Sequence, residues 1–129
     1  MGHPYMVQLV GYYMWRSAVR RDSQVIEERD VEAGHADAIS EFYEAVDAPL
    51  YYGLRSPQRL FIEAMAADED KPTRMADIIE RCDRTQSWAS KYRASLIRER
   101  VIEAAGYGLV RFTVPMLGAY ISDRILWHE

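Results

Sequence analysis

The sequence predicts a mainly α-helical protein with one small β-hairpin, and three observations carry this prediction. Residues 85–100 have the helical spacing of apolar side chains, with Ala89, Tyr92 and Leu96 on one face. Two short stretches of alternating apolar residues follow, joined across a Gly-Tyr-Gly turn at 106–108. Two shorter helices are expected just before, with a tight turn between the second and the third. Three helices that end in a hairpin form a winged helix-turn-helix, here preceded by two more helices.

The composition is typical of a globular protein inside the cell. The chain has 129 residues, of which 49% are hydrophobic, enough for a buried core. No apolar run approaches the roughly 20 residues that span a membrane, and the N-terminus lacks the basic region of a signal peptide. The one cysteine, Cys82, cannot form an internal disulfide. We therefore expect a cytoplasmic protein without a membrane partner.

Residues 1–54 are expected to form a helical segment that comes before the winged helix. A first helix is predicted over 4–21. Its apolar stripe is broader than a helix with one solvent-facing side needs. A second helix is predicted over 30–46, with Asp30 as its N-cap, and Asp47-Ala48-Pro49 is predicted to end it. The apolar residues 49–54 are interpreted as a packed connector. This interpretation places the domain boundary between residues 54 and 55.

Residues 55–129 are expected to form the winged-helix domain. Ser56 before Pro57 predicts the start of its first helix, and Thr73 is expected to cap the second. Pro115 is expected to end the hairpin and to open a final helix. The predicted elements are helices over 57–67, 74–82 and 85–100, strands over 101–105 and 109–114, and a final helix that packs through Leu117, Tyr120, Ile121 and Ile125.

Positive charge is concentrated in the predicted third helix and hairpin, although the whole chain has a net charge of -4. Residues 1–55 contain 5 Lys or Arg and 9 Asp or Glu, a net of -4. Residues 84–111 contain six basic and two acidic residues, a net of +4. Because salt limits electrostatic reach to about 8–10 Å, the local sign decides whether a surface attracts a polyanion. The basic residues stand where a winged helix contacts DNA.

The outward face of the third helix is predicted to contact DNA. Its small residues permit close approach to a groove, and its long cations reach phosphates or guanine edges. Base contacts are expected at the N-terminal end of the helix, from Gln86 and Ser87. The alternative is a solvated amphipathic helix, because basic outer faces are common. The outward residues are Gln86, Ser87, Ser90, Lys91, Arg93, Ala94 and Arg98.

The hairpin and two flanking arginines complete the predicted interface. Tyr107, at the tip between two glycines, and Arg111, on a strand, are expected to enter a minor groove or to lie along the DNA backbone. Arg74 and Arg84 are expected to contact phosphates beside the helix. The alternative is a turn whose glycines supply positive φ angles, with Tyr107 merely exposed.

The sequence contains no motif of catalysis, metal binding or nucleotide binding. It has no phosphate-binding glycine loop, no dinucleotide fingerprint and no CxxC pair. The histidines, His3, His35 and His128, share no metal-ligand spacing. We therefore expect no enzyme activity, no cofactor and no metal site in this chain.

Two parts of the chain carry a family resemblance. The stretch SPQRLFIEAMA, followed by RMADIIERCDRTQSWASKYRASLIRERVIEAAGYGLVRFTVPMLGAYI, resembles the C-terminal winged helix of a group of bacterial and archaeal AAA-type ATPases. These ATPases are distantly similar to initiator ATPases of the origin-recognition type. GHPYMVQLVGYYMWR looks like the last helix of the ATPase lid, and RDVEAGHADAI looks like the helix that follows it. Together the resemblance covers nearly the whole chain.

The resemblance implies that the chain is the C-terminal part of a larger ATPase. ATP and Mg²⁺ would belong to the upstream core, and we assign no nucleotide-sensing arginine, because Gly2 is followed by His3, Pro4 and Tyr5. The leading hypothesis is a DNA-binding module whose partners are double-stranded DNA and its own ATPase core. The alternative is a regulatory or protein-interaction winged helix that packs on that core or forms a homodimer, without binding DNA.

Overall fold

The computed structural model describes residues 28–126 and divides the chain into two compact units, with the boundary between Val46 and Asp47. In the first unit, the described residues form α2 (Glu28–Phe42) and the start of a π-helical turn (Tyr43–Asp47). The helix predicted over residues 4–21 lies outside the described residues.

The helical backbone does not end where the sequence suggested. The π-helical turn leads directly into α3 (Ala48–Gly53), so the predicted helix end at Asp47-Ala48-Pro49 is wrong. Pro49 lies in the first turn of α3, where a residue needs no N–H donor and proline is tolerated. The stretch interpreted as a connector is therefore mostly helical, and it buries Tyr51 and Leu54.

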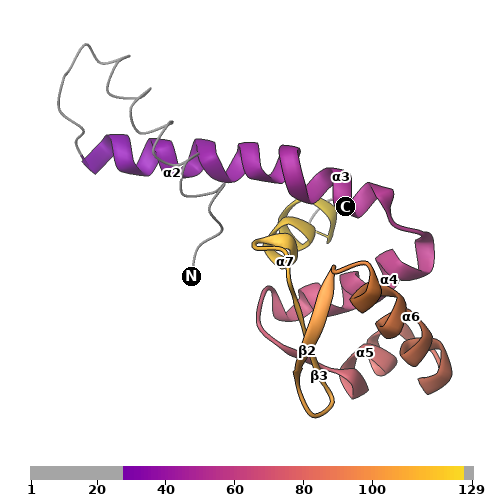
Figure 1. Cartoon of the computed structure of the whole chain (residues 1–129). Helices are drawn as coiled ribbons and strands as arrows, with labels where there is room; N and C mark the ends of the chain where they lie inside the picture. The colour runs from indigo at the N-terminus through magenta and orange to yellow at the C-terminus, as the bar shows by residue number, and fades with distance from the viewer. Residues whose placement is uncertain (1–27, 127–129) are drawn as a thin grey trace. The chain divides into compact units, whose positions relative to one another are not determined.

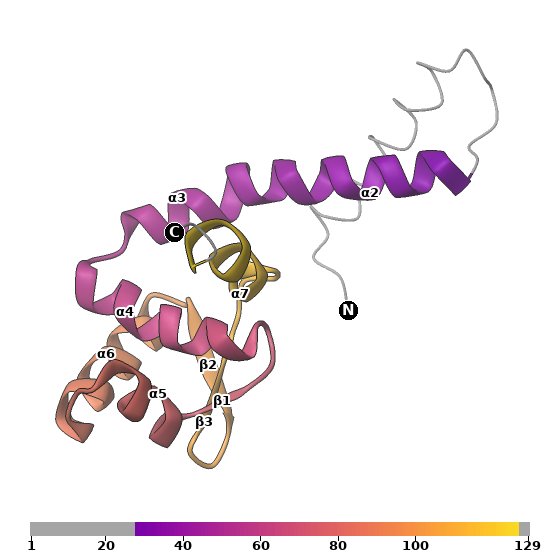
Figure 2. The ribbon, with the colours of Figure 1, turned by 180° about the vertical axis from the view of Figure 1, so that it is seen from behind.

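The second unit is mainly helical with a small antiparallel sheet (Figures 1 and 2). The sheet has the strand order β1-β3-β2, and β2 and β3 form the hairpin. Three helices and the hairpin appear in the order of a winged helix-turn-helix, as the sequence predicted. The elements are α4 (Ser56–Met65), β1 (Thr73–Arg74), α5 (Met75–Cys82), α6 (Gln86–Arg98), β2 (Ile102–Gly106), β3 (Leu109–Phe112), α7 (Leu117–Tyr120) and a π-helical segment (Ile121–Leu126).

Strand β1 was not predicted, and it changes the role of Thr73. Thr73 does not cap a helix: it pairs with Val110 in the sheet, is almost fully buried, and donates from Oγ1 to the carbonyl oxygen of Met65 at 3.3 Å. Helix α5 then begins at Met75, whose N–H donates to the carbonyl oxygen of Gly108 in the hairpin turn at 2.9 Å. These contacts hold the hairpin against the start of α5.

The starts of two other helices differ from the prediction by one or two residues. Helix α4 begins at Ser56, so its N-cap is Arg55, whose backbone N–H donates to the side chain of Gln58 at 3.0 Å. Pro115 does not open the final helix, because Met116 adopts a left-handed conformation (φ 68°) and α7 begins at Leu117. Helix α6 begins at Gln86, within one residue of the predicted start, and Thr85 caps it by accepting from the N–H of Trp88 at 3.1 Å.

The core of the second unit lies among the three helices, the sheet and α7. Burying a valine, leucine, isoleucine, phenylalanine or methionine side chain stabilises a fold by roughly 1.5–3 kcal/mol relative to leaving it exposed. The final helical segments contribute Leu117, Tyr120 and Ile121, as predicted, whereas Ile125 is only half-buried. The fully buried side chains of the remaining elements include Phe61, Ile62, Met65, Ile78, Leu96, Ile102 and Val110.

One buried polar side chain joins the start of α4 to the end of α6. Gln58 is only 2% exposed, and its amide nitrogen donates to Ser95 Oγ at 2.8 Å and to the carboxylate of Glu99. Because a buried amide without partners destabilises a fold, these hydrogen bonds favour one orientation of α6 against α4. The orientation of α6 decides which of its side chains face outward.

Candidate nucleic-acid interface

A tight turn between α5 and α6 sets the position of the candidate recognition helix. Asp83 adopts a left-handed conformation (φ 52°) at the end of α5, and its N–H donates to the carbonyl oxygen of Glu80 at 3.2 Å. Ala89 and Leu96 of α6 are completely buried, as the sequence predicted. These two residues fix the inward side of α6, so the opposite side faces solvent.

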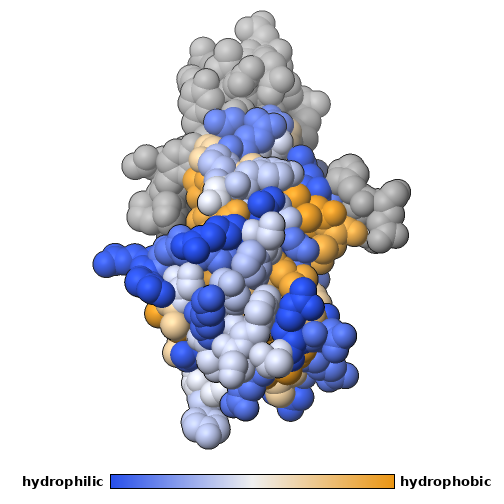
Figure 3. All heavy atoms as spheres, turned by 90° about the vertical axis from the view of Figure 1, so that its right-hand side faces the viewer, coloured by the Kyte–Doolittle hydropathy of each residue, from blue (hydrophilic) through white to orange (hydrophobic). Residues whose placement is uncertain are grey.

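The structure places the predicted outward residues of α6 on its solvent-facing side. Arg93 is the exception, because its side chain is half-buried. Figure 3 views the molecule from the side on which α6 lies in Figure 1, and the surface of the second unit there is largely hydrophilic or intermediate. A helix face of this kind suits a polar partner better than an apolar one. The exposed residues are Gln86, Ser87, Ser90, Lys91, Ala94 and Arg98.

Two cations of this region lie over aromatic rings. The guanidinium carbon of Arg84 stands 5.9 Å from the ring centre of Trp88, and Lys91 Nζ stands 5.3 Å from that of Tyr92. The two rings are 5.1 Å apart and both are half-buried. Cation–π contacts restrict these long side chains without neutralising their charge. Arg84 and Lys91 therefore remain able to bind an anion.

Two of the predicted DNA-contacting arginines are already paired with carboxylates. Arg74 binds Asp77 with an N–O distance of 2.9 Å, and Arg111 binds Glu103 across the hairpin at 2.7 Å. The hydrogen bond from Arg74 lowers the pKa of Asp77 below its ordinary value, so this carboxylate stays charged near neutral pH. Sequence reasoning named the arginines and missed their partners. Two signals in the sequence could have indicated these pairs. Arg74 and Asp77 have the i,i+3 spacing of a helical ion pair, and Glu103 lies opposite Arg111 in the register of the hairpin.

The remaining cations have no such partner. Among residues 28–126, no ion pair is formed by Arg84, Lys91, Arg93 or Arg98. Glu99, the acidic residue just after α6, instead accepts hydrogen bonds from Gln58 and Ser95. The four unpaired cations therefore give the α6 region a local positive charge.

The hairpin turn presents an exposed aromatic side chain. Tyr107 is fully exposed at the tip, between Gly106 (φ 131°) and Gly108 (φ 69°). Residues with side chains rarely adopt these φ values, so the glycines are required by the turn. The turn geometry and the exposure of Tyr107 agree with both interpretations of the hairpin: one that contacts DNA, and one whose turn merely exposes Tyr107.

Three further features of the described residues concern metal binding, the cysteine and membrane spans. In residues 28–126, no group of three or more His, Cys, Asp or Glu side chains could hold a metal ion. Burial raises the pKa of the Cys82 thiol, which disfavours its reactive thiolate form. No helix of the described part has the length and apolar character to cross a bilayer.

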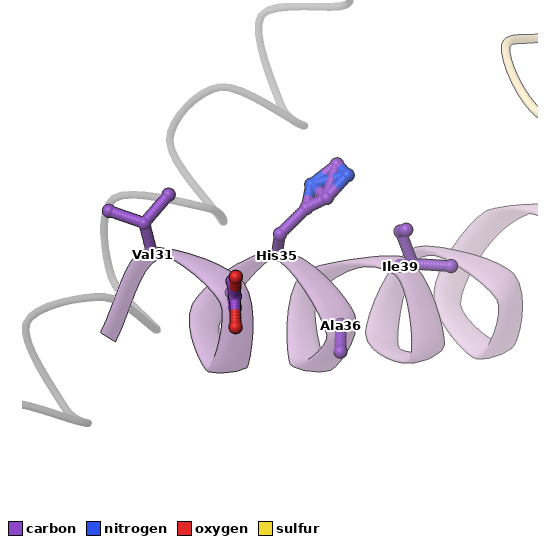
Figure 4. Close-up of a pocket in the computed structure, with 5 residues that line it drawn as sticks. Val31, His35, Ala36 and Ile39 are labelled. Carbon is purple, nitrogen blue, oxygen red and sulfur yellow. The ribbon is translucent and has the colours of Figure 1, made fainter. Parts of the chain in front are cut away.

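A separate hollow of about 510 Å³ lies along α2 in the first unit. Figure 4 shows Val31, His35 and Ile39 pointing to the same side of the helix, one turn apart. One imidazole among mainly apolar side chains does not form a catalytic set. We assign no site to this hollow.

Comparisons with known proteins identify a family and nothing more specific. Residues 48–121 match a family described as a domain of unknown function (DUF8462). No curated protein and no solved structure matches the chain. The matched residues run from the start of α3 to the end of α7, so they include the whole candidate interface. Because the match covers more than half of the chain, we conclude that the chain belongs to the DUF8462 family.

Proposed function

We propose that the second unit binds double-stranded DNA, with α6 in the major groove. The observation that supports this proposal best is the outer face of α6. Lys91 and Arg98 are exposed on this face, and Arg93 is half-buried on the same helix. None of the three has a carboxylate partner among the described residues. Small side chains, Ser87 and Ser90, are exposed beside them. A groove-binding helix needs both cations for phosphates and short residues for close approach.

The remaining residues of the interface would act around α6. Gln86 and Ser87, in its first turn, would contact base edges, and Arg84 would contact a phosphate beside them. Tyr107 would reach the backbone or the neighbouring minor groove. Arg74 and Arg111 would exchange their carboxylate partners for phosphates, because ion pairs between exposed side chains contribute little to stability.

We also propose that this unit is the C-terminal part of an AAA-type ATPase, as its sequence resemblance implies. The upstream core would hold ATP and Mg²⁺ and would be a second partner, while this chain supplies no catalytic group. Genomic sequence upstream of Met1 tests this proposal. A phosphate-loop motif encoded there in the same reading frame would support it, and its absence from the genes of several DUF8462 members would contradict it.

Removing two of the unpaired cations should weaken DNA binding strongly. For Lys91→Ala combined with Arg98→Ala, we expect at least a tenfold loss of affinity for duplex DNA, about 1.4 kcal/mol. Four phosphate contacts predict a slope of log affinity against log salt of about -4, and the double variant should lower its magnitude to about -2. Fluorescence anisotropy with labelled duplex over a range of salt concentrations measures both quantities.

Two controls separate position from charge. Lys91→Arg with Arg98→Lys keeps both charges and should retain most of the affinity, whereas Lys71→Ala removes an exposed charge in the loop before β1 and should change little. No binding by the natural chain at low salt, or equal binding by the double alanine variant, would contradict the DNA proposal.

Releasing Arg111 of the hairpin from its ion pair with Glu103 should strengthen DNA binding. Glu103→Gln removes the carboxylate that holds Arg111 at 2.7 Å, so we expect an affinity gain of about threefold to tenfold. The same anisotropy assay measures it. Adding Arg111→Gln should abolish the gain, and Glu69→Gln, the same charge change on an exposed residue outside the hairpin, should not reproduce it. A gain that survives the loss of Arg111 would show that the release of Arg111 is not its cause, and would contradict the phosphate contact proposed for Arg111.

A protein-interaction winged helix remains the second candidate. The observations that favour it are the ion pairs that already engage Arg74 and Arg111, and the 62% exposed side chain of Tyr52 on α3. Such a unit would pack on the ATPase core or on a second copy. Sedimentation equilibrium of the chain, with and without duplex DNA, distinguishes a homodimer without DNA affinity from a DNA-bound monomer.

A further inference from the structure

A second hollow lies in the second unit, and none of its lining residues belongs to α6. It measures about 340 Å³ and is lined by residues of α3 and α4. Ser56, Arg59, Leu60 and Glu63 follow one another at helical spacing on one face of α4, and Tyr51 of α3 completes the lining. This volume is at the small end of the range found for small-molecule sites.

Two opposite charges in this hollow do not pair with each other. Arg59 and Glu63 are one helical turn apart, a spacing at which such residues commonly form an ion pair. In the structure, Tyr51 engages both instead. Its hydroxyl donates to Glu63 Oε2 at 2.7 Å, and the guanidinium carbon of Arg59 stands 5.9 Å from its ring centre. Burial raises the pKa of Tyr51 above its ordinary value, so the hydroxyl keeps the proton that it donates.

Both charged groups retain unused hydrogen-bonding capacity. Arg59 Nε is buried and has no hydrogen-bond partner, which is uncommon because a buried donor without an acceptor costs free energy. Glu63 receives its hydrogen bond from Tyr51 through Oε2, which leaves Oε1 available. Arg59 and Glu63 form no ion pair within the described part of the chain.

We infer that this hollow binds a small zwitterion, a free α-amino acid with an apolar side chain. The ligand's carboxylate would accept from the planar guanidinium of Arg59, whose parallel N–H donors match the two oxygens of a carboxylate. Its ammonium group would donate to Glu63 Oε1. Its side chain would lie against Leu60 and the ring of Tyr51. The negative charge of Glu63 disfavours a polyanion here, so this inference is independent of DNA binding.

Calorimetric titration of the whole chain with L-leucine and L-phenylalanine tests the inference without DNA. We expect saturable binding of one ligand per chain at concentrations up to about 10 mM, where even millimolar affinities are measurable. Leucinamide lacks the carboxylate and N-acetyl-leucine lacks the ammonium group. Each should bind at least tenfold more weakly than leucine, because each leaves one of the two charges without a partner.

Two variants localise the binding. Arg59→Lys keeps the charge and loses the planar pair of donors, and Glu63→Gln removes the charge that holds the ammonium group; each should weaken leucine binding at least tenfold. Arg55→Lys and Glu80→Gln, at exposed positions outside the hollow, should leave binding unchanged. Circular dichroism confirms that each variant is folded.

Several results would overturn the inference. One is the absence of saturable binding by either amino acid to the folded natural chain. Another is binding of N-acetyl-leucine as tight as that of leucine, or leucine binding that Arg59→Lys and Glu63→Gln leave unchanged. A third is a dimer that these two variants dissociate with no amino acid bound, because Arg59 and Glu63 would then belong to an interface between two copies.

Discussion

Replacing Gly118 with alanine is expected to destabilise the winged-helix unit by about 3 kcal/mol or more, a large effect for one added methyl group. A β-carbon at this position would overlap the backbone carbonyl group of Glu69 and would lie 3.0 Å from the backbone nitrogen of Asp70. Both contacts are with backbone, so no side chain can rotate away to make room. The backbone itself would have to move.

The surrounding hydrogen bonds oppose that movement. The carboxylate of Asp70 accepts from the N–H of Gly118 at 2.9 Å and from the N–H of Ala119 at 3.1 Å. These bonds satisfy donors at the start of α7, so separating the loop from the helix would expose them. Gly118 is therefore needed because the backbone at Glu69 and Asp70 comes too close to α7 for a β-carbon, and not because its own backbone requires a positive φ angle.

Urea denaturation followed by circular dichroism measures this loss. Gly53→Ala is the matched control, because a β-carbon at Gly53 would meet no atom within 4 Å. Gly53 lies at the end of α3, where alanine is expected to change the free energy of unfolding by no more than about 0.5 kcal/mol. A Gly118→Ala protein as stable as the Gly53→Ala protein would show that the loop and α7 are not packed as described.

Asp47 is expected to make the stability of the protein decrease as the pH rises. Its side chain is completely buried, and neither carboxylate oxygen has a hydrogen-bond partner. Burial, and to a smaller extent the charge of Asp70, raise the pKa of Asp47 from 3.8 to about 7. The folded protein therefore holds a proton on Asp47 under conditions in which the unfolded chain has lost it.

The sign of the effect follows from proton linkage. Below about pH 4, Asp47 is protonated in both states and contributes no pH dependence to stability. Between about pH 4 and pH 7 the folded state binds more protons than the unfolded state, so the free energy of unfolding falls as the pH rises. Above pH 7 the buried charge lowers stability by roughly 4 kcal/mol relative to the protonated form.

Asp47→Asn should remove this dependence, because the amide stays neutral at every pH. We expect the variant and the natural chain to be similarly stable at pH 4, and the variant to be more stable by up to about 4 kcal/mol at pH 8. Urea denaturation at both pH values gives the difference. The pKa values of Asp68 and Asp77 are shifted downward by their arginine partners, an effect of opposite sign that cancels between the two proteins.

Asp123→Asn is the control for this experiment, since Asp123 is an exposed carboxyl of the same unit. It should not alter how stability varies with pH. If Asp47→Asn were instead less stable than the natural chain at pH 8, the charged carboxylate would have a partner in solution. That result would remove Asp47 as the source of the pH dependence.

Residue periodicity was sufficient to predict α4, α5, α6 and the hairpin. Burying Ala89 and Leu96 leaves the opposite side of α6 exposed, because a helix repeats every 3.6 residues. Cap and turn residues also act locally: Thr85 caps α6, and Gly106 and Gly108 supply the positive φ angles of the hairpin turn. These features depend on neighbours in the chain, so they can be read from the sequence.

Features that depend on distant residues were missed. Strand β1 has only two residues and no periodicity of its own, and it exists because β3 lies beside it. The close approach of Gly118 to the loop at Glu69 joins residues 49 positions apart. The helix end predicted near Pro49 failed because a π-helical turn moved the proline into a first turn.

The sequence by itself determined the order of α4, α5, α6 and the hairpin, and the basic outer face of α6, because helical repeat, capping and turn chemistry are local. Only the tertiary structure decided which charges remain unpaired. It joined Arg111 to Glu103, left Lys91 and Arg98 without carboxylate partners in the described part, and kept Arg59 apart from Glu63. Whether a charge is available to a ligand depends on which groups folding brings within a few ångströms, since attraction between charges falls with distance and with screening.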